Sequence, residues 1–156
     1  MPLFVVLRHE VGPKFARDVD ASAHFDWMFQ IDQTLWTWST DPVDDFVTGI
    51  EIDARRIADH RLAYLEITGD IGGDRGTVQP VLRGTYTLVE STDDLFSAVM
   101  HWEDESGSHH QAITIERHGA DSDRLSESVC RLSLGCLLYT SPSPRDATLS
   151  RMPSSA

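Results

Sequence analysis

The sequence predicts an all-β protein of mainly antiparallel strands with short helical turns, folded as a barrel or a sandwich. Short segments alternate apolar and polar residues, which is the pattern of strands with one buried face. Polar or glycine-containing turns separate these segments at close spacing, and no segment carries the pattern of a long helix. With 156 residues, 40% of them hydrophobic, the chain is long enough for one domain with a substantial core.

The first strand is expected at residues 3–7, a short apolar run with β-branched residues that ends at Arg8-His9. Residues 10–22 mix charged residues with glycine and proline. They predict a loop with one helical turn near residues 14–18.

Residues 24–31 form the clearest predicted strand. Its core-facing residues are Phe25, Trp27, Phe29 and Ile31. The set on the opposite, half-exposed face consists of His24, Asp26, Met28 and Gln30. Residues 34–39, with Trp36 and Trp38 on one face, complete a hairpin with this strand, although Asp32-Gln33 is not a favoured turn pair.

The remaining strands are shorter or less regular, and they are expected at residues 50–54, 77–81, 83–89, 95–102 and 111–117. Polar or glycine-rich loops should join them at residues 40–49, 69–76 and 103–110. Gly84 is expected to mark a bulge or a bend.

Residues 1–118 are assigned to one domain, and residues 119–135 form a polar segment that is a tail, an edge strand or a sequencing error. Residues 136–156 resemble the conceptual translation of a transposase-type sequencing adapter, in the same order and reading frame. This segment is therefore expected to be non-native and disordered. A natural tail rich in serine and proline is the alternative.

The formal net charge of −12 argues against broad electrostatic binding to nucleic acid, because affinity for DNA depends on neutralised phosphates. Five arginines can contact a few phosphates or simply be solvated among acidic residues: Arg55, Arg56, Arg61, Arg75 and Arg83. The two cysteines, Cys130 and Cys136, provide no disulfide framework. No segment suits a secretory signal or a membrane span, so a cytoplasmic protein without membrane association is expected.

His24 and Asp26 are the first candidates for a metal site. Residues two apart on a strand share a face, with about 6.5–7 Å between their Cα atoms. An imidazole and a carboxylate at this spacing can converge on one metal ion, but such pairs also occur on strands that bind nothing. The adjacent His109-His110 is a second possible metal pair, with an incidental role as the alternative.

Three motifs follow one another in an order that resembles a known family. They are Leu7-Arg8-His9, His24-Phe25-Asp26-Trp27 and Asp59-His60-Arg61-Leu62-Ala63-Tyr64. The pattern continues through Leu35 to Trp38, the glycines of residues 69–76 and Arg83-Gly84-Thr85-Tyr86. Over roughly residues 3–90 the chain resembles the 3′-phosphoesterase domain of bacterial DNA polymerase–ligases of end joining. It resembles more closely the small stand-alone proteins named as DNA polymerase ligase N-terminal domain-like.

The resemblance implies a small β-barrel that uses a divalent metal, typically Mn²⁺, to remove a 3′-phosphate or a 3′-terminal ribonucleotide from DNA. It implies His9, His24 and Asp26 as metal ligands, and His60 and Tyr64 as catalytic residues that contact the phosphate. Two imidazoles and one carboxylate leave positions for water and a phosphate oxygen. The implied partners are DNA 3′ ends and, by analogy, a DNA ligase or polymerase acting in trans during repair.

One departure from the family pattern concerns the phosphate. Active family members carry an arginine two residues after the metal-binding aspartate, where this chain has Met28. A thioether cannot replace the charge-assisted hydrogen bonds of a guanidinium, so Arg61 and Arg75 are considered as substitutes. Processing of DNA 3′ ends is the leading hypothesis. The alternatives are a non-catalytic module that binds metal or DNA ends, and a phosphoesterase for a small non-DNA phosphate ester.

Overall fold

The computed structural model describes residues 1–10, 23–70, 76–118 and 129–135. Within these residues the elements follow one another as β1 (Leu3–Glu10), β2 (Ala23–Ile31), β3 (Thr34–Thr40), β4 (Glu51–Arg61), the 3-10 helix η1 (Leu62–Leu65), β5 (Gly69–Asp70), β6 (Thr77–Ser91), β7 (Leu95–Asp104), β8 (Gly107–His118) and β9 (Val129–Leu134). The predicted all-β class is therefore confirmed. The helical turn expected near residues 14–18 lies outside the described residues, and the sequence did not predict η1. No helix in this described part is long and apolar enough to cross a membrane.

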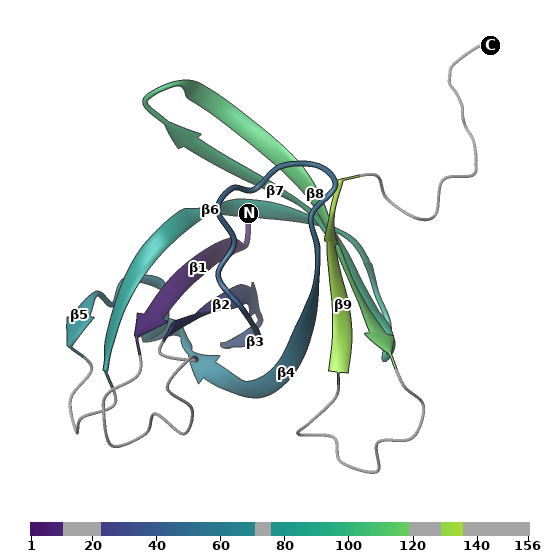
Figure 1. Cartoon of the computed structure of the whole chain (residues 1–156), viewed down its shortest axis with the longest axis horizontal. Helices are drawn as coiled ribbons and strands as arrows, with labels where there is room; N and C mark the ends of the chain where they lie inside the picture. Colours follow the sequence, from purple (N-terminus) through teal and green to yellow (C-terminus); the bar gives the residue numbers. More distant parts are fainter. Residues whose placement is uncertain (11–22, 71–75, 119–128, 136–156) are drawn as a thin grey trace.

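The strands form one antiparallel sheet that closes into a barrel (Figure 1). Their order is β1-β2-β3-β4-β9-β8-β7-β6-β5, and an additional pairing of β1 with β6 joins the two ends of the sheet. Strand β6 makes this closure possible because it is long: its first half pairs with β1 and its second half with β7. The two-residue strand β5 flanks the first half of β6 outside the closed ring. The structure thus decides between the two predicted architectures in favour of the barrel.

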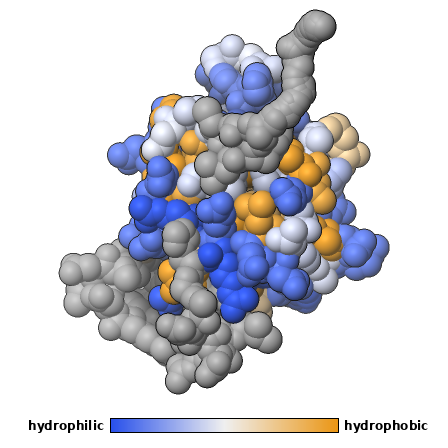
Figure 2. Space-filling view, turned by 90° about the vertical axis from the view of Figure 1, so that its right-hand side faces the viewer, coloured by the Kyte–Doolittle hydropathy of each residue, from blue (hydrophilic) through white to orange (hydrophobic). Residues whose placement is uncertain are grey.

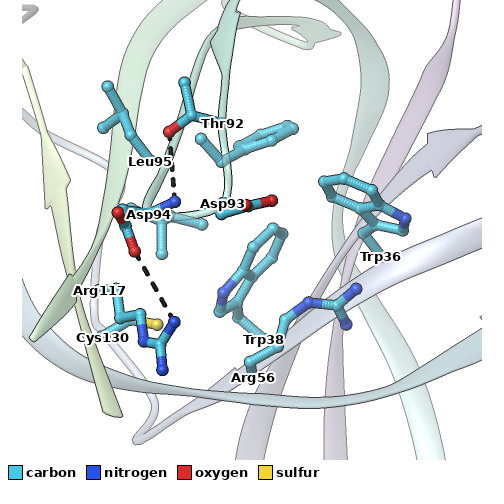
Figure 3. Close-up of a pocket in the computed structure, with 11 residues that line it drawn as sticks. Trp36, Trp38, Arg56, Thr92, Asp93, Asp94, Leu95, Arg117 and Cys130 are labelled. Atoms are coloured by element: carbon cyan, nitrogen blue, oxygen red, sulfur yellow. Dashed lines mark hydrogen bonds and ion pairs between the residues drawn. The ribbon is translucent and has the colours of Figure 1, made fainter. Parts of the chain in front are cut away.

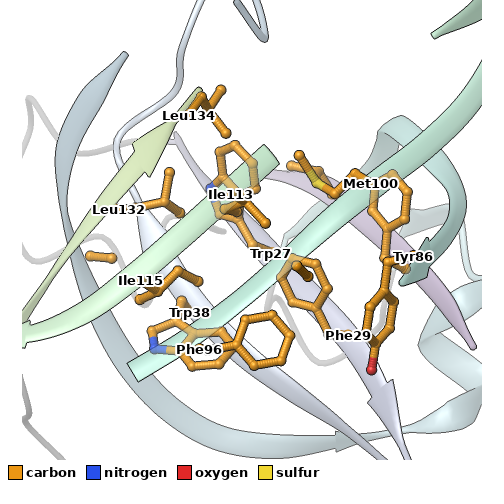
Figure 4. Packing of buried hydrophobic residues seen from close by; sticks show 14 of the residues in the cluster. Trp27, Phe29, Trp38, Tyr86, Phe96, Met100, Ile113, Ile115, Leu132 and Leu134 are labelled. Carbon is orange, nitrogen blue, oxygen red and sulfur yellow. The ribbon is translucent and has the colours of Figure 1, made fainter. Parts of the chain in front are cut away.

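Aromatic side chains fill the barrel interior (Figure 4). The ring of Phe29 lies 4.8 Å from that of Phe96 and 5.3 Å from that of Tyr86, measured between centroids. Such contacts add to the large apolar area that buried aromatic residues remove from water. The Tyr86 hydroxyl donates a hydrogen bond to the Gln30 carbonyl over 2.5 Å, and burial raises the pKa of Tyr86 to about 12. Trp36 and Trp38 pack together on the face that the sequence predicted.

A second, smaller hydrophobic cluster covers the outer side of the barrel wall. Its buried members are Val5, Leu7, Met28, Leu35 and Val78, and side chains of η1 and Ile67 pack over them. The second face of residues 24–31 is therefore not half-exposed as predicted, because Asp26 is only 4% exposed and Met28 is fully buried. Strand β2 is buried on both faces although its sequence alternates. The short chain segment after β4 returns over the sheet and provides the cover.

Four predicted boundaries are corrected by strand pairing. Strand β4 continues from residue 51 through Arg61, and β6 is one strand where two were predicted. The polar segment 103–110 belongs to the β7–β8 hairpin, in which Asp104 pairs with Gly107. Val129–Leu134 lies between β4 and β8, so the barrel extends beyond residue 118. Residues 10–22 and 136–156 were predicted as a loop and a non-native tail, and residues 11–22 and the whole tail lie outside the described residues.

Gly84 allows strands β6 and β7 to approach closely. A Cβ atom at this position would lie 1.9 Å from the His101 carbonyl oxygen, a distance that no side chain tolerates. Gly84 was predicted to mark a bulge or a bend, but the register shifts of β6 lie on either side of it, opposite Val6/Leu7 and between Leu88 and Glu90. The glycine instead permits a close contact between two backbones. On the face shown in Figure 2, hydrophilic and apolar areas alternate among the described residues.

Candidate metal centre

Pairing of β1 with β2 brings the three predicted metal ligands together. His9 lies directly opposite His24, and Leu7 lies opposite Asp26. Residues that are paired across strands, or two apart along one strand, project from the same face of a sheet. All three side chains therefore project from the outer face of the barrel wall, at the end of the second cluster that Leu7 and Met28 help to form.

The ligand atoms of His9, His24 and Asp26 lie within 4.8 Å of one another. His9 Nδ1 is 3.1 Å from His24 Nε2 and 3.8 Å from Asp26 Oδ2. His24 Nε2 approaches Asp26 Oδ1 to 3.2 Å. Two imidazole nitrogens and one carboxylate, gathered on one face, form the donor set of a 2-His-1-carboxylate metal site.

The environment of Asp26 fits a metal ligand. Its Oδ1 atom is buried and accepts no hydrogen bond from the described residues, since the contact with His24 lacks hydrogen-bond geometry. A buried carboxylate oxygen without a partner is costly, because the carboxylate loses hydration and receives nothing in return. A divalent cation between the three side chains would supply the missing interaction. The donor set suits manganese, iron or zinc, and the structure itself favours none of these.

The predicted catalytic residues form a separate pair. The rings of His60 and Tyr64 meet edge to face with 4.9 Å between centroids, and His60 Nδ1 lies 3.0 Å from the Ala58 carbonyl oxygen. His60 ends the paired part of β4, where it lies opposite Leu35, whereas Asp26 lies opposite Ser39. Leu35 and Ser39 are four positions apart on β3, which corresponds to roughly 13 Å along the strand.

Tyr64 is nevertheless on the same side of the barrel as the metal ligands. Its side chain packs against the second cluster, which contains both Leu7 and Met28. Met28 stands where active members of the similar family carry an arginine, and it is fully buried in this cluster. A guanidinium cannot simply take its place, because burial of an unpaired charge is strongly unfavourable. The thioether at position 28 is a packing residue.

The arginines considered as phosphate contacts differ in position. Arg61 is exposed at the end of β4, and Arg75 lies outside the described residues. Arg56 is held by Asp59 at 2.8 Å and lies over the rings of Trp36 and Trp38. Arg55 lines a groove that also includes His24. The sequence placed Arg55 in a general basic patch, and only the pairing of β3 with β4 distinguishes it from its neighbours.

A second pocket lies at one end of the barrel and is drawn in Figure 3. It is lined by Trp36, Trp38 and Arg56, and an ion pair of 3.7 Å joins Arg117 to Asp94 at its rim. Cys130 also lines it, and burial raises the pKa of this thiol. The pocket is separate from the groove beside His24, and its arginines already have partners.

The predicted His109-His110 pair does not form a metal site. Adjacent residues on β8 point to opposite faces. His109 stacks on Trp102, whereas the His110 ring lies 6.5 Å from the His101 ring, measured between centroids. In the described part of the chain, the only group of three or more metal-binding side chains is His9, His24 and Asp26.

The tip of the β7–β8 hairpin carries a serine, a histidine and an aspartate in contact. Ser106 Oγ and Asp104 Oδ1 lie 2.9 Å and 2.8 Å from the same atom, His109 Nε2. A catalytic triad requires the serine and the carboxylate at different imidazole nitrogens. These three side chains therefore do not form a triad, and their contacts stabilise an exposed hairpin turn. Hydrogen bonds from Ser106 and His109 lower the pKa of Asp104 to about 2.

Comparison with known proteins gives no assignment: no family model matches the chain, and no curated protein matches it either. The family resemblance therefore depends on the quoted motifs and on the site they form.

Proposed function

We propose that this protein is a metal-dependent phosphoesterase that removes a 3′-phosphate or a 3′-terminal ribonucleotide from DNA, with Mn²⁺ at His9, His24 and Asp26. The observation that carries the proposal is the buried Asp26 oxygen, which has no hydrogen-bond partner among the described residues and faces two imidazoles. The order of the motifs, which resembles the DNA polymerase–ligase phosphoesterase family, supplies the reaction class.

The chain's own residues have distinct roles in this proposal. Asp26 and the two histidines hold the cation, which when bound polarises a phosphate oxygen and lowers the pKa of water. In removal of a 3′-phosphate, water would add to phosphorus as the bond between phosphorus and the 3′ oxygen breaks. The attacking water would release one proton, and the departing 3′ oxygen would take one. By the family resemblance His60 supplies that proton and Tyr64 donates a hydrogen bond to the phosphate.

The decisive experiment incubates the full chain with Mn²⁺ and a primer–template that ends in a 3′-phosphate. Conversion to a 3′-hydroxyl is expected for the wild type and for His101→Ala, which removes an imidazole outside the site. His24→Ala should lose both conversion and Mn²⁺ binding by calorimetry. Full conversion by His24→Ala would contradict the proposal, and Mn²⁺ binding without conversion by the wild type would favour a binding module.

A phosphoesterase for a small phosphate ester is the second candidate, and the formal net charge of −12 favours it. A duplex requires cations along several phosphates, whereas a small ester requires only one anion site. The affinity of the protein for the primer–template at increasing salt separates the two. A steep loss of affinity with salt supports a DNA substrate, and a shallow one supports a small ester.

A further inference from the structure

A groove of about 480 Å³ adjoins the metal centre on the outer surface of the barrel. His24 lies at one side of this groove and Arg55 at another, with Ser39 between them in the sheet. The groove thus joins a proposed metal ligand to a guanidinium, and nothing in the family motifs quoted above assigns a role to Arg55.

Strand register fixes the geometry of this arrangement. Asp26 lies opposite Ser39, and Ser39 lies opposite Arg55, so the three residues form one row across β2, β3 and β4. Paired residues in a sheet share a face, so all three side chains project outward. Two strand spacings place the Cα atoms of Asp26 and Arg55 about 9–10 Å apart. A tetrahedral anion on the metal would therefore lie within reach of the guanidinium, above the Ser39 hydroxyl.

Arg55 is the positively charged residue of the groove, and no acidic side chain among the described residues forms an ion pair with it. The neighbouring Arg56 is bound to Asp59 at 2.8 Å, and Arg131 is bound to Asp53 at 2.8 Å. No ion pair or hydrogen bond with a described residue engages the Arg55 side chain. The Asp53 carboxylate also lines the groove, but it pairs with Arg131 and not with Arg55.

We propose that this groove is a phosphate subsite, in which the Arg55 guanidinium and the Ser39 hydroxyl bind the phosphate that the metal activates. This inference rests on the proposed function, because it takes the ion at His9, His24 and Asp26 as the other contact of that phosphate. Arg55 then performs, from β4, the task that the buried Met28 cannot perform from β2. Its planar guanidinium can donate two parallel hydrogen bonds to one phosphate.

The groove also selects the class of phosphate. Asp41 and Asp53 line it together with Arg55, so a second phosphate in the groove would meet carboxylates. The subsite therefore suits a terminal phosphomonoester that enters end-on, with the rest of the substrate directed away from the barrel.

The test measures inorganic phosphate binding to the Mn²⁺-loaded full chain by calorimetry, with Arg55→Ala, Arg55→Lys and Arg61→Ala. Arg61→Ala is the matched control, since it removes an exposed arginine from the same strand and an alternative phosphate contact. Arg55→Ala is expected to weaken phosphate binding about tenfold or more, as loss of a charge-assisted pair does, while Mn²⁺ affinity stays unchanged. Arg55→Lys should recover part of the loss, because the charge remains and the bidentate geometry does not.

Three results overturn the subsite. They are equal phosphate affinity in Arg55→Ala and Arg61→Ala, a loss confined to Arg61→Ala, and absence of phosphate binding by the wild type. Turnover of the primer–template is recorded in parallel as an independent readout of the proposed function. An Arg55-dependent phosphate site in a protein without turnover would keep the subsite and remove the enzyme assignment. Turnover that is unchanged in Arg55→Ala would keep the enzyme assignment and remove the subsite.

Discussion

Two histidine–carboxylate groups in this barrel differ in what surrounds them. At the candidate metal centre the Asp26 side chain is 6% exposed, and its Oδ1 atom has no hydrogen-bond partner among the described residues. At the β7–β8 hairpin the Asp104 side chain is 52% exposed and accepts hydrogen bonds from Ser106 and contacts His109. Both groups contain residues that bind metals, yet only the first leaves a buried ligand atom unsatisfied.

This difference distinguishes a candidate cation site from a turn of similar composition. In the hairpin, local hydrogen bonds already stabilise the carboxylate, so a ligand would have to displace them. At the candidate metal centre, strands β1 and β2 and the outer cluster hold the three side chains in place, while Asp26 Oδ1 has no hydrogen-bond partner among the described residues. A preorganised, buried ligand atom of this kind is what a cation site requires.

The largest expected effect concerns the packing that supports the metal centre. Met28→Ala should lower the free energy of unfolding by about 2–5 kcal/mol, because a fully buried side chain leaves a cavity beside Asp26. Met28→Leu should cost less than about 1.5 kcal/mol, since volume is nearly conserved. Exposed Leu88→Ala is the surface control and should change stability by about 0.5 kcal/mol or less. Urea unfolding measures all three, and a loss equal to that of Leu88→Ala would show that the outer cluster is not a packed unit.

The second effect concerns the metal itself. Mn²⁺ at 100 times its dissociation constant should stabilise the wild type by about 2.7 kcal/mol, because the ion binds only the folded chain. Asp26→Asn should abolish this increase, whereas Asp104→Asn should retain it. Thermal unfolding with and without Mn²⁺ makes the measurement. If only Asp104→Asn lost the stabilisation by Mn²⁺, the ion would bind at the β7–β8 hairpin and not at Asp26.

The smallest effect concerns the hairpin carboxylate. The pKa of Asp104 is lowered to about 2, first by the Ser106 hydroxyl, then by His109 and the Ser106 backbone amide. A lowered pKa in the folded state means that this contribution to stability is complete above the ordinary value of 3.8 and is lost as the pH falls toward 2. Ser106→Ala should move the Asp104 pKa back toward 3.8. A carboxyl carbon titration by NMR measures this shift, and an unchanged pKa would mean that the hydroxyl is not the main cause.

Sequence alone predicted the strands that carry local signals. The alternation in residues 24–31 and the short turn after them specified the β2–β3 hairpin, because register in a hairpin depends on adjacent residues. The same alternation suggested an exposed second face, which is wrong because η1 covers it. That cover comes from residues more than thirty positions later in the chain, and periodicity contains no information about such distant packing.

The candidate site likewise has residues that local motifs predict and residues that only the strand pairing reveals. His9, His24 and Asp26 could be grouped from ordered motifs, and the structure brings them together. Arg55 could not be singled out from four other arginines, because its relation to His24 depends on the register of β4 against β3. For residues 119–135 the sequence left an edge strand as one of three alternatives. Val129–Leu134 is a strand, but it lies between β4 and β8, and only these two neighbours reveal that position.

The place of β9 has a consequence for how the barrel folds. This strand completes the wall by entering between β4 and β8, and its Arg131 binds Asp53, 78 positions earlier in the sequence. During synthesis, β1 to β8 must emerge first, with the edges of β4 and β8 unpaired until residues 129–134 leave the ribosome. Open strand edges are the surfaces through which chains pair with one another, so this interval is the period of greatest risk of aggregation. Strand β9 is the last of the described strands to be synthesised, and a chain that stops before residue 129 would leave the facing edges of β4 and β8 unpaired.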